Sequence, residues 1–229
     1  MSPEGLVESG SVARAIRTPR AAALAGIAFS LLFAVALVLV RTAVPADPHD
    51  AEQWLSDGSR HDAVLLGLGL VPFAGIAFLW FVGVVRDRIG EAEDRFFATA
   101  FLGSGLLFVG MIFAASAVAG GLIVAAEQNA DRLLSSGAWE LGRETTYELM
   151  VVYAMRMAAV CVLAISTLLR TRLAPRWLVA SGYGIAIVLL LTVGSFAWVE
   201  LLFPAWVLAL SVYVLVTSFR GRAEAVPPP

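Results

Sequence analysis

The chain has 229 residues, of which 59% are hydrophobic and 15% are charged, with a formal net charge of −2 and a mean hydropathy of +0.84. A typical soluble domain is roughly 45–50% apolar and about 25% charged. This composition excludes a disordered chain, a secreted disulfide scaffold and an ordinary soluble enzyme, and it predicts an integral membrane protein.

The apolar residues fall in blocks long enough for transmembrane helices, since one crossing needs about 20 residues. A basic cytoplasmic segment, 1–20, precedes them, and the tail 220–229, which ends in three prolines, is predicted to be disordered. The last block, Trp177–Phe219, has 43 residues and one charge, Glu200, so we expect two helices there, the second beginning near Pro204. The predicted crossings of the 21–219 domain are 21–40, 63–85, 96–126, 149–169, 177–198 and 204–219.

The distribution of arginine predicts the orientation of these helices. With the N-terminus inside, the inner segments hold 11 arginines and the outer segments hold 4. Cytoplasmic loops are enriched in basic residues, so we predict an all-α, polytopic six-helix bundle with both termini inside. The first block resembles a signal peptide, but its 20 apolar residues exceed the 7–15 of a signal core, which favours an uncleaved span.

An acidic loop follows the first predicted crossing, and another precedes the fourth. Within them, Pro48–Asp57 contains Trp54, and Leu133–Tyr147 contains Trp139. Each segment mixes acids with large apolar residues, a pattern that favours a short helix lying on the outer membrane surface with its tryptophan at headgroup depth.

The third predicted crossing is rich in small residues. Four of them recur at steps of four, three and four, and therefore share one helical face: Gly110, Ala114, Ala117 and Gly121. Small faces let helices approach closely in lipid, so we expect this face to serve helix packing, with a substrate crevice as the alternative. The block of 31 residues would be about 46 Å long as one helix, so it must tilt, protrude or break, with Gly120–Gly121 as the expected place of a break.

Arg156 is the one charge deep inside a predicted crossing, with Tyr153 one turn away. An arginine at the centre of a membrane helix costs roughly 2.5–3.5 kcal/mol, so we expect it to have a carboxylate partner, Glu148 or Glu200. The first of these belongs to a row of residues at steps of four: Glu140, Glu144, Glu148, Val152 and Arg156. These residues form a candidate polar site within the membrane, either an anion or proton site or a structural ion pair.

The reactive residue types exclude several cofactor classes. All 16 basic residues are arginine, so no lysine Schiff base can form. Cys161 is the one cysteine, and His49 and His61 both lie outside the apolar blocks, which excludes a cysteine metal cluster and a mid-membrane haem held by two histidines. We predict no cofactor, no metal site and no nucleic acid partner. The lack of lysine beside abundant alanine and arginine is typical of a GC-rich bacterial genome.

Three short stretches carry a resemblance to a known group of proteins: Arg41–Asp47, Arg172–Ala180 and Phe203–Trp206. Together with the layout of the apolar blocks, they resemble uncharacterised bacterial six-helix membrane proteins labelled only as a domain of unknown function. The resemblance implies six helices in a bacterial cytoplasmic membrane, and it implies no activity and no site residues.

Three hypotheses of function follow from these observations. We favour a non-enzymatic bundle that binds a lipid-like or small ligand, or a partner, in the bilayer, with a homo-oligomer or another membrane protein as the partner. The alternatives are a small-solute or ion transporter that uses Arg156, and a membrane-embedded enzyme that acts on lipid. The enzyme is disfavoured because no predicted crossing contains Asp, His, Lys or paired carboxylates for acid–base chemistry.

Overall fold

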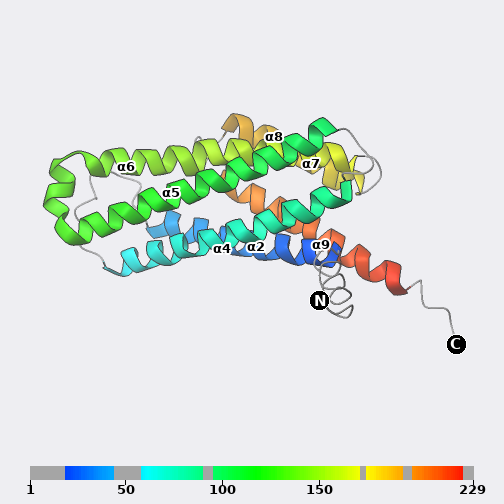
Figure 1. Cartoon of the computed structure of the whole chain (residues 1–229), viewed down its shortest axis with the longest axis horizontal. Helices are drawn as coiled ribbons and strands as arrows, with labels where there is room; N and C mark the ends of the chain where they lie inside the picture. The colour runs from blue at the N-terminus through cyan, green and yellow to red at the C-terminus, as the bar shows by residue number, and fades with distance from the viewer. Residues whose placement is uncertain (1–18, 44–57, 90–94, 171–173, 193–197, 224–229) are drawn as a thin grey trace, which may run out of the picture.

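Figure 1 shows the computed structural model, a bundle of long helices that lie side by side along one axis. The structure describes residues 19–43, 58–89, 95–170, 174–192 and 198–223, and nothing in these ranges forms a strand. The helices are α2 (Pro19–Ala43), α4 (Gly58–Ile89), α5 (Arg95–Ser135), α6 (Ala138–Tyr147), the π-helix η2 (Glu148–Tyr153), α7 (Ala154–Leu169), α8 (Arg176–Thr192), the 3-10 helix η3 (Val199–Leu201) and α9 (Leu202–Ala223).

The helices are arranged as a closed ring. Going round it, α9 contacts α2, α2 contacts α4, α4 contacts α5, α5 contacts α7, α7 contacts α8, and α8 contacts α9. At one end of the bundle, which we call the hairpin end, α5 turns into α6 through Gly137, whose φ of +69° suits a residue without a Cβ. At the other end, the start of α2 meets the end of α9, where Arg20 Nη2 donates a hydrogen bond to the carbonyl oxygen of Ser218 at 3.5 Å.

Five helical segments are long and apolar enough to cross a membrane: Arg20–Arg41, Asp62–Arg86, Phe96–Ser135, Ala138–Leu169 and Val199–Ser218. In lipid, a helix satisfies its own backbone hydrogen bonds, and long apolar segments therefore form helices there. The helix α8 has 17 residues and is shorter than these five.

Several predicted boundaries differ from the structure. The helix expected at 96–126 runs without interruption through Gly120 and Gly121, so the break expected there is wrong, and α5 kinks instead at Asn129, where the backbone angles are not helical (φ −165°, ψ 90°). Before this kink, residues 95–128 form a continuous helix of 34 residues, about 51 Å long and therefore longer than a hydrocarbon core of about 30 Å, and the residues after the kink extend the hairpin. The tail expected to be disordered from 220 is helical to Ala223, and 224–229 lie outside the described residues.

Phenylalanine rings fill the centre of the ring of helices. Phe29 and Phe33 come from α2, Phe78 from α4, Phe108 from α5 and Phe203 from α9, and none has any exposed surface. The ring centroids of Phe29 and Phe78 are 4.6 Å apart, and those of Phe108 and Phe203 are 5.0 Å apart in an edge-to-face arrangement. This aromatic core joins four helices at one level of the bundle, because large rings make many close contacts.

The small-residue face of α5 does not fulfil the expected packing within the described chain. Gly110, Ala114, Ala117 and Gly121 are all exposed, and no described atom lies within 4 Å of a Cβ added at either glycine. The opposite face of α5 packs instead, through large side chains such as Phe108. In lipid, helices associate through van der Waals packing, and the large side chains of this face make many such contacts with α2, α4 and α9.

The helix expected on the membrane surface near Trp139 is part of the bundle instead. The segment α6 packs along α5 and continues through η2 into α7, and Trp139 is only 5% exposed. It belongs to a second apolar cluster near the hairpin end, made of Val64, Leu68, Ile123, Ala126, Leu133 and Trp139. The other expected surface helix, Pro48–Asp57, lies outside the described residues.

Candidate functional site

A cavity of about 400 Å³ lies between the aromatic core and the second apolar cluster. We call it the hairpin pocket. Its position follows from the helices: Leu37 is one turn beyond Phe33 on α2, and Val64, Ile123 and Trp139 contribute from the second cluster. The lining is mostly apolar and comprises Leu37, Val40, Arg41, Val64, Ala119, Leu122, Ile123, Trp139, Arg143, Thr146, Tyr147, Met150, Val151, Trp198, Glu200 and Leu201.

An ion pair lines one side of the hairpin pocket. Nη1 of Arg41, at the end of α2, donates to both carboxylate oxygens of Glu200 on η3, at 3.0 and 3.1 Å. The Glu200 side chain is 5% exposed, whereas that of Arg41 is 39% exposed. A buried carboxylate needs such a partner, because removing an unpaired charge from water is costly.

Trp198 also contacts the Arg41 guanidinium. The Arg41 Cζ is 5.4 Å from the centroid of the indole ring, within the range of a cation–π contact. Trp198 has a φ of +71°, the left-handed region that bulky residues rarely adopt. Backbone strain of this kind persists where the surroundings hold a residue in place, and such residues often occur at ligand-binding sites.

Arg143 supplies a second guanidinium to the pocket from α6. Its Nη2 donates to Oε1 of Glu144 at 2.6 Å, and the carboxylate of Glu144 is mostly exposed. The Nε atom of Arg143 is buried and has no hydrogen-bond partner among the described residues. Thr146 lines the pocket next to it and donates its hydroxyl hydrogen to the carbonyl oxygen of Gly142 at 2.8 Å, which leaves the hydroxyl oxygen able to accept.

The π-helical segment η2 forms part of the pocket wall through Met150 and Val151. A π-helix pairs residues five apart, so each of its turns takes in more residues than an α-helical turn. Short π-helical segments within α-helices occur frequently at functional sites. The same segment interrupts the row of residues predicted at steps of four, because the residues after it are rotated relative to those before it.

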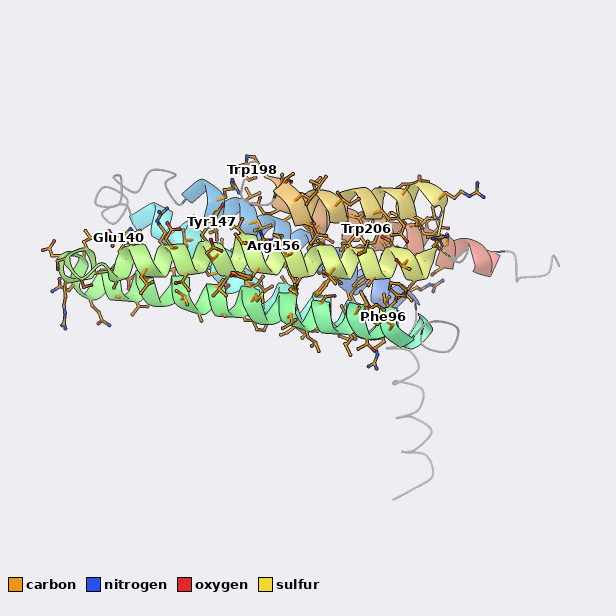
Figure 2. All side chains as sticks on the ribbon, turned by 90° about the horizontal axis from the view of Figure 1, so that it is seen from above. Phe96, Glu140, Tyr147, Arg156, Trp198 and Trp206 are labelled. Carbon is orange, nitrogen blue, oxygen red and sulfur yellow. The ribbon has the colours of Figure 1, made fainter. Side chains whose placement is uncertain are left out.

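The structure separates the residues of the predicted polar site. Glu200 lines the hairpin pocket, but Arg156, Tyr153 and Glu148 do not, and all three are exposed. The expected pairing of Arg156 with Glu200 is wrong, because that carboxylate is bonded to Arg41. No ion pair joins Arg156 to Glu148 in the part of the chain that the structure describes; the two are eight residues apart with η2 between them. Figure 2 shows Arg156 farther from the hairpin end than Tyr147, about midway along the length of the bundle.

The sequence interpretation missed the roles of Arg41 and Arg143, which it treated only as indicators of topology. The sequence did contain an indication of the Arg41–Glu200 ion pair. Both residues end apolar stretches at the same predicted side of the membrane, and their charges are opposite. Arg143 carried no such signal, since its contribution depends on α6 packing against α5.

The chain matches no protein-family model, no curated protein and no solved structure.

Proposed function

We propose that the chain is a multi-pass protein of the bacterial cytoplasmic membrane whose hairpin pocket binds a lipid-like ligand without chemical conversion. The observation that carries this proposal is the cavity of about 400 Å³ with a mostly apolar lining and a few polar groups. Small-molecule sites have this composition, and their volumes are about 300–1,000 Å³. The pocket also lies at the boundary of the apolar blocks, where an amphipathic molecule reaches from the bilayer.

In this proposal the chain crosses the membrane six times, with both termini inside and the hairpin end outside. Contacts at both ends of the bundle support six crossings. At the hairpin end, Glu200 precedes α9 and pairs with Arg41 at the end of α2, while Arg20 and Ser218 meet at the opposite end. Since α7 ends and α9 begins at opposite ends of the bundle, the chain has to cover the length between them, and the 17 residues of α8 lie on that path.

Two features favour binding over transport through the bundle. The aromatic core fills the centre of the ring directly below the pocket, and Arg156, on which the transport hypothesis depends, is exposed outside the pocket. The pocket also has one carboxylate, Glu200, and it is bonded to Arg41, so the lining offers no free carboxylate pair for acid–base catalysis on a lipid.

Filling the pocket tests the proposed function. Ala119 lines the cavity, and Ala119→Phe should occupy it, whereas Ala117→Phe places the same ring on the exposed face of the same helix. The full-length chain and both variants are purified from native membranes, and the molecules that remain bound are identified by lipid mass spectrometry. We expect about one amphiphile per chain in the wild type and in Ala117→Phe, and a loss of it in Ala119→Phe. Equal retention by a folded Ala119→Phe variant would contradict the proposal.

Cysteine labelling tests the topology. In a background in which Cys161 is replaced by alanine, cysteines at Ser56 and Ser136 should react with an impermeant reagent from outside, and cysteines at Gly90 and Gly221 only after the membrane is opened. Labelling of position 90 in intact cells would exclude the arrangement with both termini inside.

A further inference from the structure

The charges of the hairpin pocket do not balance. The lining holds two guanidinium groups, Arg41 and Arg143, and one carboxylate, Glu200. Both oxygens of that carboxylate accept from Arg41, so this pair is internally neutral. Arg143 therefore gives the lining one positive charge whose carboxylate partner, Glu144, lies outside the lining.

Glu144, the carboxylate that Arg143 contacts, competes only weakly with a ligand for the guanidinium. Glu144 is not part of the pocket lining, and its side chain is 58% exposed. Exposed ion pairs contribute little to stability, since water and salt screen them. The pair also uses only one of the five N–H donors of the guanidinium and leaves the buried Nε unpaired within the described chain. A buried donor without a partner is costly unless a ligand satisfies it.

We propose that the hairpin pocket takes a single-chain amphiphile with an anionic, oxygen-rich headgroup, a carboxylate or a phosphate monoester, and that Arg143 recognises this headgroup. This inference rests on the proposed function, because it assigns a chemical class to the ligand of the same pocket. A planar guanidinium binds two oxygens of a carboxylate or phosphate at once through parallel N–H donors. The hydrocarbon chain then lies along the apolar walls formed by residues such as Leu37, Leu122 and Met150.

The arrangement assigns different work to the two arginines. Arg41 neutralises the negative charge of the buried Glu200. Arg143, by contrast, has N–H groups that make no hydrogen bond within the described chain and can bind a ligand. Thr146, three residues from Arg143 and therefore one turn along the same face, already donates its hydroxyl hydrogen to Gly142, so it adds no donor for an anionic headgroup. A neutral headgroup can use the N–H donors of Arg143 too, but it gains less, since hydrogen bonds to charged groups are the stronger ones.

Three probes with one hydrocarbon chain separate the headgroup from the chain: stearate, stearyl phosphate and stearyl alcohol, each with a photoreactive diazirine on the chain. The purified full-length protein is labelled over a range of probe concentrations, and peptide mass spectrometry measures the labelling of the pocket-lining segments. We expect half-saturation by the two anionic probes at a concentration about tenfold lower than by the alcohol, which corresponds to about 1.4 kcal/mol. A lower value for the phosphate than for the carboxylate would identify a phospholipid-type headgroup, and the reverse order a fatty acid.

Substitutions of Arg143 test whether this residue recognises the headgroup. Arg143→Gln should abolish the tenfold preference while the alcohol still labels the pocket, and Arg143→Lys should retain only part of it, because an ammonium lacks the planar fork. Arg132→Gln is the matched control: it removes the same charge from the same hairpin, at an exposed position outside the pocket lining. We expect it to label like the wild type.

Two failures are distinguishable in this experiment. If all three probes label the wild-type pocket equally, or if Arg143→Gln keeps the preference, the anionic headgroup is wrong while the lipid-binding pocket stands. If no probe labels the wild-type pocket more than that of Ala119→Phe, the proposed function itself is wrong.

Discussion

Replacing Arg41 should destabilise the fold more than removing the charge of Glu200, the carboxylate that it binds. Arg41→Met leaves the carboxylate of Glu200, which is 5% exposed, without its described partner. Breaking a buried ion pair costs about 3–5 kcal/mol, but Arg41 is 39% exposed and water replaces it in part, so we expect a loss of about 2–3 kcal/mol. Glu200→Gln keeps an oxygen that accepts from Arg41 and should cost about 1 kcal/mol.

The double variant separates the ion pair from other effects of each substitution. With both changes, the stranded carboxylate is absent, so the total loss should be about 1–2 kcal/mol smaller than the sum of the single losses. The free energy of unfolding is measured for the purified chain in mixed micelles titrated with SDS, with helicity followed by circular dichroism. A coupling within about 0.3 kcal/mol of zero, or an Arg41→Met variant as stable as the wild type, would refute the reasoning.

Two further predictions use the same unfolding assay. Gly182→Ala adds a Cβ that meets Oγ of Ser166 and lies 2.8 Å from a ring carbon of Trp206, so we expect a loss of about 1–3 kcal/mol from overpacking. Gly184→Ala on the same helix meets no described atom within 4 Å and should gain about 0.5–1 kcal/mol from helix propensity; equal effects of the two would contradict the packing described for α8. Arg156→Met should leave stability unchanged or raise it by up to about 3 kcal/mol, since an exposed arginine in lipid is costly, and a loss above about 1 kcal/mol would show that Arg156 has a stabilising partner.

The long apolar blocks and their charged boundaries could be read directly from the sequence. The apolar segments Arg20–Arg41 and Asp62–Arg86 are helical throughout and lie within the longer helices α2 and α4, because in lipid a continuous apolar segment has no favourable alternative to internal hydrogen bonding. The all-helical class follows from the same local physics, as does the pair of helices predicted within Trp177–Phe219. Six crossings and the orientation of the chain stay predictions.

The sequence did not predict correctly which side of a helix faces the bundle interior. The small-residue face of α5 pointed to packing by its sequence, yet the structure leaves Gly110 and Gly121 exposed and buries Phe108. The helix near Trp139 had the pattern of a surface helix, but it stacks on α5 because Val64 and Ile123 of neighbouring helices provide an apolar surface for it. Periodicity shows that a face exists, and only the neighbouring helices decide what covers it.

The candidate site shows the same division. From the sequence alone, the apolar segments, the position of Arg156 within one of them and the carboxylate of Glu200 between two others were determined, since these depend on residues close together in the chain. The tertiary structure decided that Glu200 pairs with Arg41, 159 residues away, and that Arg143 reaches a cavity between two apolar clusters. A cavity forms where side chains from several helices fail to fill the space between them, so it is a property of their packing and has no counterpart in any single segment.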